Sequence, residues 1–447
     1  MLFKIPNVEN RLNDRYFQLI REHTGHAHTN AAGPKALPAE SDNFASTQAL
    51  WRFCKNRFVT PTRLANPLFQ AAQQSLENSC DQYTLVPCDW SKLDYATHTR
   101  KTDRICLGQV QEWGYHLFSA VLLSDRTGQP LAPLAMELEA AAGVYSTRSD
   151  EPLTHQTNLD QLLPVMNWAA QQSLARTPVY LVDAEADSIF HYRSWSAAGH
   201  LFLVRADKER LVQWEDQEQP LSQILGTLQQ RAALRFERQV EYHGQKAQQY
   251  VAEVEVVLDR PAYQERKDET GRVRKKTIPG IALPLRLILA EVRSADGTVL
   301  AQWYLLSNVP ATVSSATIAL WYYWRWLVES FFKLLKTAGM HLEQWQQRSG
   351  LAIFRRLLVA SAACVWVWHL ARSTAPEAEK VRFFLYRLSG MQKEHGQPIR
   401  EEMLLAGLWV LLCMDDVLRQ YDPAEIHAMV AFLQDGVGWF LKNARDG

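Results

Sequence analysis

Several features that define common protein classes are scarce or absent in this sequence of 447 residues. Its six cysteines form no Cys-x-x-Cys pair and no dense framework, which favours reduced thiols in a cytosol over a disulfide-rich secreted domain. The first residues, MLFKIPNVENRLNDRYF, lack the apolar core of a signal peptide. The longest apolar run, residues 357–371, is too short for a membrane span and contains His369, so we interpret it as a buried helix.

Several catalytic motifs are missing as well. The sequence has no Gly-x-x-x-x-Gly-Lys loop, so ATP-driven chemistry is not indicated, and neither Gly-x-Ser-x-Gly nor His-Glu-x-x-His occurs. The stretch HTGHAH, with His23, His26 and His28, is compatible with a transition-metal site or with an ordinary loop that carries histidines. The chemistry of this chain must therefore be sought mainly in its acidic and basic residues.

Net charge is absent too, because 48 Lys and Arg residues balance 48 Asp and Glu residues. A neutral chain does not by itself indicate a nucleic-acid partner. The charges are unevenly spread, however, and residues 43–76, 271–290 and 344–376 contain basic side chains but no acidic one. This segregation predicts local basic surfaces that can meet phosphates.

The pattern of apolar and turn residues predicts an α/β protein with several parts, and 47% hydrophobic residues suffice for a large core. Residues 1–80 are expected to be helical and to bind DNA. Residues 81–205 alternate β-type runs with helical segments, as in an α/β domain. Residues 206–300 are expected to be mostly strands, inserted into that domain, which resumes over 301–373. Residues 374–447 are expected to be helical and are a candidate dimerisation region.

The segment WYYWRWLVESFFKLLK, residues 321–336, combines many aromatic side chains with a few charged ones. If it forms one helix of about 100° per residue, then Tyr322, Arg325, Glu329 and Lys336 share a stripe about 60° wide. One interpretation is a core helix with a few solvated charges. The other is a chemical grouping, in which the cations bind phosphates and the carboxylate binds a metal ion.

Three carboxylates stand out in this pattern. Asp89 and Asp183 each end a buried β-type run, and Glu329 lies on the amphipathic segment. Ligands usually meet an α/β sheet at its strand ends, so the three side chains are expected to converge. Together they would suit Mg²⁺, which prefers oxygen ligands and, in pairs about 3.5–4 Å apart, supports phosphodiester cleavage. Taken singly, each Asp is equally compatible with a cap or turn.

The spacing Tyr322-x-x-Arg325-x-x-x-Glu329-x-x-x-x-x-x-Lys336 resembles the Y-R-E-K signature of DDE transposases of insertion-sequence family four. This is the cut-and-paste group typified by the Tn-five enzyme. Asp183 lies in VDAEAD, which is similar to the family's D-R-E-A-D. The stretch TQALWRFCKNRFVT resembles the family's N-terminal end-recognition region. The resemblance extends from about residue 40 to about residue 345, and the last third matches in helical texture only.

Two departures from the family pattern concern the first two carboxylates. Trp90 and Ser91 replace the small hydroxyl residues that follow the first Asp of the family, so Asp94 is an alternative to Asp89. Ala184 replaces the Arg that commonly follows the second Asp, so a phosphate contact made by that Arg elsewhere is missing here.

The resemblance implies an RNase H-like catalytic core interrupted by a β-strand insertion, with helical N-terminal and C-terminal regions. It implies cutting of a mobile element at its terminal inverted repeats, through nicking, hairpin formation and resolution, followed by joining to target DNA. The cofactor would be Mg²⁺, with Mn²⁺ as a substitute. Partners would be double-stranded DNA, from transposon ends and target, and a second copy of the chain in a synaptic homodimer. The setting would be the bacterial cytoplasm and nucleoid, with no membrane.

The resemblance also implies roles for individual residues. The expected catalytic and metal-binding residues are Asp89, Asp183 and Glu329. The DNA-binding residues that the resemblance implies are Tyr322, Arg325, Lys336 and Trp303. The acid-free basic stretch GRVRKK predicts, separately from the resemblance, an exposed turn against DNA that carries Arg272, Arg274, Lys275 and Lys276. Trp303, in QWYLLSN, would stack on a flipped base, worth roughly 1–3 kcal/mol, although ordinary packing is the alternative in a chain with 15 Trp.

Two other functions compete with an active transposase. One is a metal-dependent DNA nuclease that cuts without strand transfer. The other is a domesticated DNA-binding protein that has lost catalysis. The presence of all three carboxylates, Asp89, Asp183 and Glu329, argues against this second alternative.

Overall fold

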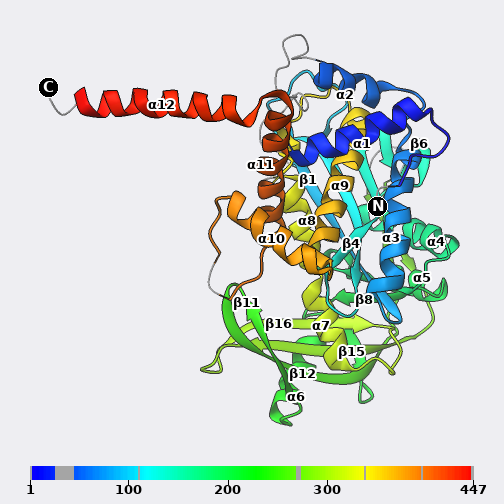
Figure 1. The fold of residues 1–447 in the computed structure, drawn as a ribbon. Coiled ribbons are helices and arrows are strands. Elements are labelled where there is room, and N and C mark those ends of the chain that lie inside the picture. Colours follow the sequence, from blue (N-terminus) through cyan, green and yellow to red (C-terminus); the bar gives the residue numbers. More distant parts are fainter. Residues whose placement is uncertain are drawn as a thin grey trace.

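A computed structural model describes residues 3–25, 45–108, 111–267, 273–336, 339–393 and 396–443 of the chain and shows a mixed α/β fold (Figure 1). The predicted α/β class is confirmed. Three helices precede the first strand, namely α1 (Asn10–Gly25), α2 (Ala45–Lys55) and α3 (Pro61–Ser79). Helix α3 starts where Thr60 caps its first turn and Pro61 occupies the first helical position, whose N–H would have no helical partner in any case.

Five strands form the middle of the main sheet in the order β4-β3-β1-β7-β8. Their bounds are β1 (Tyr83–Asp94), β3 (Trp113–Ser124), β4 (Pro130–Ala140), β7 (Thr177–Val182) and β8 (Leu201–Arg205). Strands β1, β7 and β8 run parallel, whereas β3 is antiparallel to both β1 and β4. The first six residues of β1 are buried, as expected of an apolar run covered on both faces. The short strands β2 (Ile105–Cys106), β5 (Gly143–Ser146) and β6 (Ser149–Leu153) extend this part.

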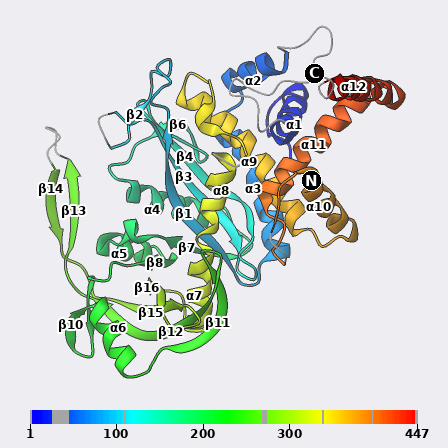
Figure 2. The same cartoon turned by 90° about the vertical axis from the view of Figure 1, so that its left-hand side faces the viewer.

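Helices cover both faces of these strands. Figure 2 shows α4 (Leu162–Gln171) and α5 (Ile189–Ala197) on one side, and α3, α8 (Leu327–Leu335) and α9 (Gly350–Arg372) on the other. Helix α7 (Ser315–Trp324) precedes α8. The turn between β3 and β4 holds Gly128 at a φ of 71°, and a Cβ there would lie 2.5 Å from the ring of Trp324. The turn therefore touches α7 too closely for a larger residue.

Helix α9 is the central helix of the core. It is apolar all round, as expected of a helix without a solvent face, and it packs against α1, α3 and β4. By length and composition it is the one helix in the described residues that qualifies as a membrane span, but most of it is buried inside the molecule. The apolar run is therefore part of a longer helix than the sequence suggested, and its interpretation as a buried helix agrees with the structure.

Most strands after β8 continue the same sheet rather than forming a detached one. They are β9 (Leu211–Trp214), β10 (Gln217–Pro220), β11 (Arg235–Tyr242), β12 (Gln245–Leu258), β15 (Leu283–Arg293) and β16 (Val299–Ser307), with helix α6 (Leu221–Gln230) between β10 and β11. Strand β16 pairs with β15 on one side and with β8 on the other. Figure 1 shows these strands across the end of the molecule opposite α2. The strand-rich character expected here is present, and α6 adds a helix that the sequence pattern did not indicate.

Two parts project from the body. Strands β13 (Ala262–Lys267) and β14 (Val273–Ile278) form a separate antiparallel pair that stands apart as an arm (Figure 2). At the other end of the chain, α10 (Pro376–Leu388) and α11 (Glu401–Gln420) pack on each other, and α12 (Pro423–Asn443) extends away from the molecule (Figure 1).

Candidate active site

The parallel pairing of β1 and β7 brings the first two predicted carboxylates together. The last paired positions are Cys88 and Val182, so Asp89 and Asp183 follow side by side. Asp183 comes directly after β7 and accepts a hydrogen bond of 2.6 Å from the N–H of Ala184. The expectation that Asp89 ends its strand is wrong. Strand β1 continues beyond it, still antiparallel to β3, whereas its buried stretch and its parallel pairing with β7 end at Cys88, just before Asp89.

The helix expected over residues 321–336 is broken. Helix α7 ends at Trp324 and α8 begins at Leu327, and the hydrogen bonds between them join residues three apart rather than four, as from the Arg325 N–H to the Tyr322 carbonyl. The single helical projection is therefore wrong. At the break Arg325 turns inward and is only 6% exposed, whereas Trp326 is 57% exposed.

Arg325 is the centre of the site. One terminal nitrogen of its guanidinium, Nη2, lies 3.0 Å from Asp183 Oδ2 and 3.6 Å from Glu329 Oε1. The other, Nη1, lies 3.6 Å from Asp89 Oδ2. The structure thus brings together all three predicted carboxylates, from β1, from the end of β7 and from α8, around one buried cation.

The electrostatics of this cluster depend on burial and on Arg325. Burial raises the pKa of Asp89 and of Glu329, and the positive charge of Arg325 acts against that rise in both. For Arg325 itself, burial lowers the pKa, but Tyr322 and the three carboxylates outweigh it and the pKa is raised. The charge of Arg325 therefore favours the ionised forms of Asp89 and Glu329, and the nearby carboxylates favour the charged form of Arg325.

Arg205 is a site residue that the sequence reasoning missed. It is the last residue of β8, and its Nε lies 2.7 Å from Asp183 Oδ1. Since β7 and β8 are parallel, their carboxyl ends share one edge of the sheet. The basic residue at the end of the apolar run LFLVR could therefore have been predicted to lie near Asp183. Arg205 places a cation beside Asp183, whereas Ala184, which replaces the family's Arg, carries no charge.

Tyr322 and Trp303 form an aromatic pair next to Asp183. The Tyr322 hydroxyl donates a hydrogen bond of 3.4 Å to Asp183 Oδ1, and burial raises its pKa, so the hydroxyl keeps its proton at neutral pH. Its ring meets the ring of Trp303 edge to face, with centroids 5.7 Å apart. Trp303, on β16, is half-buried. The pairing supports the packing alternative for Trp303 without covering its ring entirely.

Lys336 lies outside the carboxylate cluster. At the end of α8 its Nζ is 2.9 Å from Glu343 Oε1 and donates a hydrogen bond of 2.7 Å to the Lys92 carbonyl. Glu343 also accepts from the N–H of Asp94, whose own carboxylate accepts from Ala96 in a turn. Asp94 therefore serves the end of β1, and the geometry favours Asp89 as the carboxylate of the site.

The predicted basic turn is only partly visible. Lys276, on β14, is exposed. Arg272 lies outside the described residues, and Arg274 and Lys275 are described as backbone positions of β14. The structure therefore places Arg274, Lys275 and Lys276 on the projecting arm.

The histidine-rich stretch does not add a metal site among the described residues. His26 and His28 lie outside them. The ring of His23 is engaged at both nitrogens, because Nδ1 lies 2.7 Å from the Leu19 carbonyl oxygen and Nε2 lies 3.3 Å from Arg356 Nε. The transition-metal alternative loses His23 as a ligand.

The donor atoms of the carboxylate cluster suit a divalent metal ion, but the positions of the three side chains are not those of a formed metal site. Carboxylate oxygens are the ligands that Mg²⁺ prefers. Within the described ranges, however, no group of three or more His, Cys, Asp or Glu side chains stands in the geometry of a formed metal site. The guanidinium of Arg325 lies among the three carboxylates instead, at 3.0–3.6 Å.

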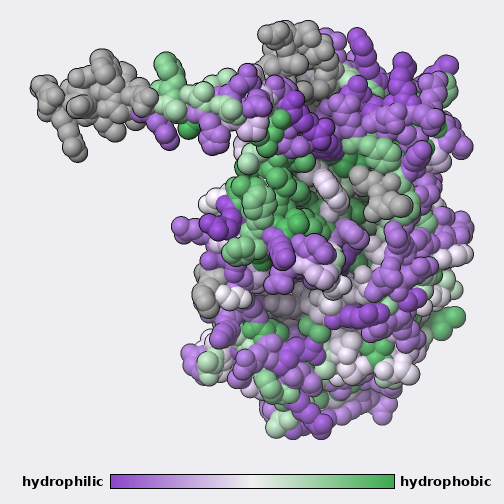
Figure 3. Space-filling view, in the orientation of Figure 1, coloured by the Kyte–Doolittle hydropathy of each residue, from purple (hydrophilic) through white to green (hydrophobic). Residues whose placement is uncertain are grey.

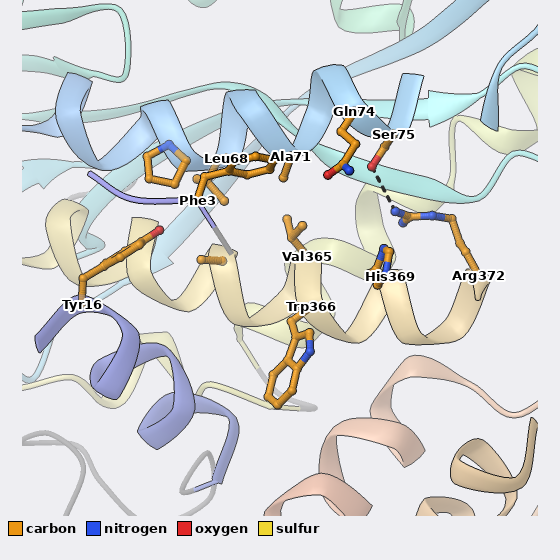
Figure 4. A pocket seen from close by; sticks show the side chains of 12 residues that line it. Phe3, Tyr16, Leu68, Ala71, Gln74, Ser75, Val365, Trp366, His369 and Arg372 are labelled. Atoms are coloured by element: carbon orange, nitrogen blue, oxygen red, sulfur yellow. Dashed lines mark hydrogen bonds between the residues drawn. The ribbon is translucent and has the colours of Figure 1, made fainter. Parts of the chain in front are cut away.

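One largely apolar pocket lies in a different part of the molecule. It measures about 260 Å³, lies between α3 and α9, and is lined by side chains such as Phe3, Leu68, Val365 and Trp366 (Figure 4). None of the predicted site residues lines it, and no carboxylate does. Cleavage chemistry is therefore not expected in this pocket.

Comparison with known proteins bears on the same region. The family model described as Transposase DDE domain matches residues 114–367, more than half of the chain. The match includes Asp183, Trp303 and the whole of α7 and α8, while Asp89 lies before it. No curated protein matches the chain.

Proposed function

Since the chain belongs to the family of DDE transposases, we propose that it cuts a mobile DNA element at its terminal inverted repeats and joins it to target DNA. The cutting would proceed by nicking, hairpin formation and hairpin resolution, in the cytoplasm on nucleoid DNA. The observation that carries the proposal is the convergence of Asp89, Asp183 and Glu329 at one edge of the sheet.

We infer that the catalytic core is RNase H-like and is made of residues 81–205 and 301–373. The order β4-β3-β1-β7-β8, with an antiparallel half and a parallel half meeting at β1, supports this. Residues 206–300 are then the insertion, residues 1–80 the end-binding domain, and 374–447 the region of dimerisation. The pairing of β16 with β15 on one side and with β8 on the other joins the insertion to the core in one sheet.

Asp89, Asp183 and Glu329 would hold Mg²⁺, or Mn²⁺ in its place. When bound, such ions activate an attacking oxygen and stabilise the leaving one in phosphodiester cleavage. The residues of the chain have other tasks. Arg325 and Lys336 bind backbone phosphate, and Arg205 adds a further cation for it. Tyr322, whose hydroxyl keeps its proton, donates a hydrogen bond to the phosphate of the extruded nucleotide.

One experiment separates this function from its alternatives. The protein is incubated with Mg²⁺, with duplexes carrying the two ends of the element and with a supercoiled target. Nicked and hairpin ends, followed by ends joined to the target, are expected of a transposase. Cut ends that are never joined indicate a nuclease, and specific binding without any cut indicates a domesticated DNA-binding protein.

The arm of β13 and β14 is proposed to contact DNA. Replacing Arg272, Arg274, Lys275 and Lys276 by Ala should weaken DNA binding and flatten its salt dependence, because each lost phosphate contact lowers the slope of log K against log salt by about 0.9. The measurement is fluorescence anisotropy of a labelled duplex over a range of salt concentrations. Arg419→Ala, at a position that is 72% exposed on α11 and pairs with Asp415, serves as the control. An unchanged slope in the fourfold variant would show that the arm faces solvent in the complex.

Helix α12 is proposed to join two copies of the chain. Figure 3 shows hydrophobic side chains along its described part and over the region below its base. Met429, Phe432 and Leu433, at helical spacing, are 52%, 78% and 64% exposed, which forms an apolar stripe without a partner in one chain. Such a stripe is expected to be covered by a second copy in the synaptic homodimer.

Phe432→Glu should turn the dimer into a monomer, because a buried carboxylate without a partner opposes association. Light scattering coupled to size-exclusion chromatography measures the mass. Gln434→Glu adds the same charge to α12 on another side and should leave the dimer intact. Equal masses for both variants would exclude the apolar stripe as the interface.

A further inference from the structure

Arg325 occupies the space that a metal ion would need. A divalent ion shared by the three carboxylates requires oxygens at about 2.0–2.1 Å. Instead, one guanidinium lies among Asp89, Asp183 and Glu329 at 3.0–3.6 Å and neutralises part of their charge. The guanidinium and a metal ion would compete for the same carboxylate oxygens, so one has to leave before the other binds fully.

The same residue is withdrawn from DNA. A phosphate contact needs an accessible guanidinium, but Arg325 is only 6% exposed. Arg205, by contrast, contacts only Asp183 within the cluster and has a side chain that is 40% exposed. If Arg325 binds a phosphate, as the proposed function requires, it has to move out of the carboxylate cluster.

The backbone around Arg325 permits such a movement. Arg325 lies in the break between α7 and α8, where the hydrogen bonds join residues three apart. A side chain at a break is able to change direction without the disruption of a continuous helix. Its neighbour Trp326 faces solvent, so the break is open on that side.

We propose that Arg325 is a gate that couples DNA binding to metal binding. In the DNA-free protein it holds the three carboxylates and keeps the affinity for metal ions low. A backbone phosphate at the site draws the guanidinium away, and the uncovered carboxylates then bind the ions. The gate prevents the assembly of a cleaving site on protein that carries no DNA. This inference rests on the proposed function.

The test is the affinity of the DNA-free protein for Mn²⁺, measured by electron paramagnetic resonance of the free ion. Arg325→Gln removes the competing charge and should bind Mn²⁺ about tenfold more tightly than wild type, within the usual range of coupling between sites. Arg325→Lys, which keeps a charge but cannot span three carboxylates, should lie between them. The double variant Arg325→Gln/Glu329→Gln should lose the gain, which locates the ion at the carboxylates.

Arg205→Gln is the matched control, because it removes a cation from Asp183 without emptying the centre of the cluster. If Arg205→Gln gains much less Mn²⁺ affinity than Arg325→Gln, the gate is supported. An equal gain would show that the affinity depends only on the overall charge of the site. A second readout is melting temperature, where Mn²⁺ should stabilise Arg325→Gln more than wild type. If Arg325→Gln and wild type bind Mn²⁺ equally, the gate is wrong and the proposed function stands. If wild type binds no Mn²⁺ even with a duplex end present, beyond what the duplex binds alone, the metal assignment of the proposed function fails instead.

Discussion

Asp183→Asn and Glu329→Gln are expected to slow nicking of element ends by roughly a thousandfold, about 4 kcal/mol of transition-state stabilisation, while end binding stays close to wild type. Each replacement removes an ionised oxygen ligand but keeps the shape of the side chain and leaves Arg205 and Arg325 in place. Nicking is measured on a labelled end duplex with Mg²⁺ under single-turnover conditions, and binding by anisotropy without metal.

The control for these variants is Glu215→Gln, which neutralises a surface carboxylate paired with Arg231 on the insertion. It should nick at the wild-type rate. Near-normal nicking by either Asp183→Asn or Glu329→Gln would remove that residue from the metal assignment. Loss of end binding together with nicking would show that the carboxylate organises the DNA site rather than the chemistry.

The convergence of the carboxylates was predictable because it depends on the sheet. Two apolar runs that each end in Asp become neighbouring parallel strands, and the register of β1 and β7 then sets Asp89 beside Asp183. Glu329 followed from the spacing of its segment, although the segment is not one helix. Sheet pairing joins segments far apart in the chain, but the carboxyl ends of parallel strands always meet at one edge of the sheet. Short sequence patterns were therefore enough to predict that the carboxylates converge.

What the sequence did not reveal depends on contacts between segments far apart in the chain. No Pro or Gly marks the break at Arg325, and the two helices pack on different strands, α7 on β12 and β15 and α8 on β1. The phosphate contact of Lys336 stays a prediction, but the sequence did not reveal that its Nζ pairs with Glu343, on the turn after α8. The direction of long charged side chains is set by such partners, which helical projection does not include.

Trp303→Ala is expected to nick element ends at close to the normal rate but to form hairpins roughly ten to a hundred times more slowly. The first nick needs only an attacking water, a phosphate and the metal ions. A hairpin requires the two strands to approach tightly, which is easier when one base leaves the stack at a cost of a few kcal/mol. The half-buried ring of Trp303, held against Tyr322, offers that base a stacking face. Gel analysis of nicked and hairpin products over time measures both steps.

Two comparisons separate this role from simple packing. Trp303→Phe retains an aromatic face and should recover most of the rate of hairpin formation that Trp303→Ala loses. If Trp303 only packs, Trp303→Phe should instead restore nicking and hairpin formation to the same extent. An abasic site at the extruded nucleotide removes the cost of unstacking, and it should partly rescue Trp303→Ala. If Trp303→Ala is insoluble, or is equally slow at nicking and hairpin formation and is not rescued, then the edge-to-face contact with Tyr322 is the main task of Trp303. In that case the base-flipping role is excluded, and the extruded base must be stabilised by another surface of the site.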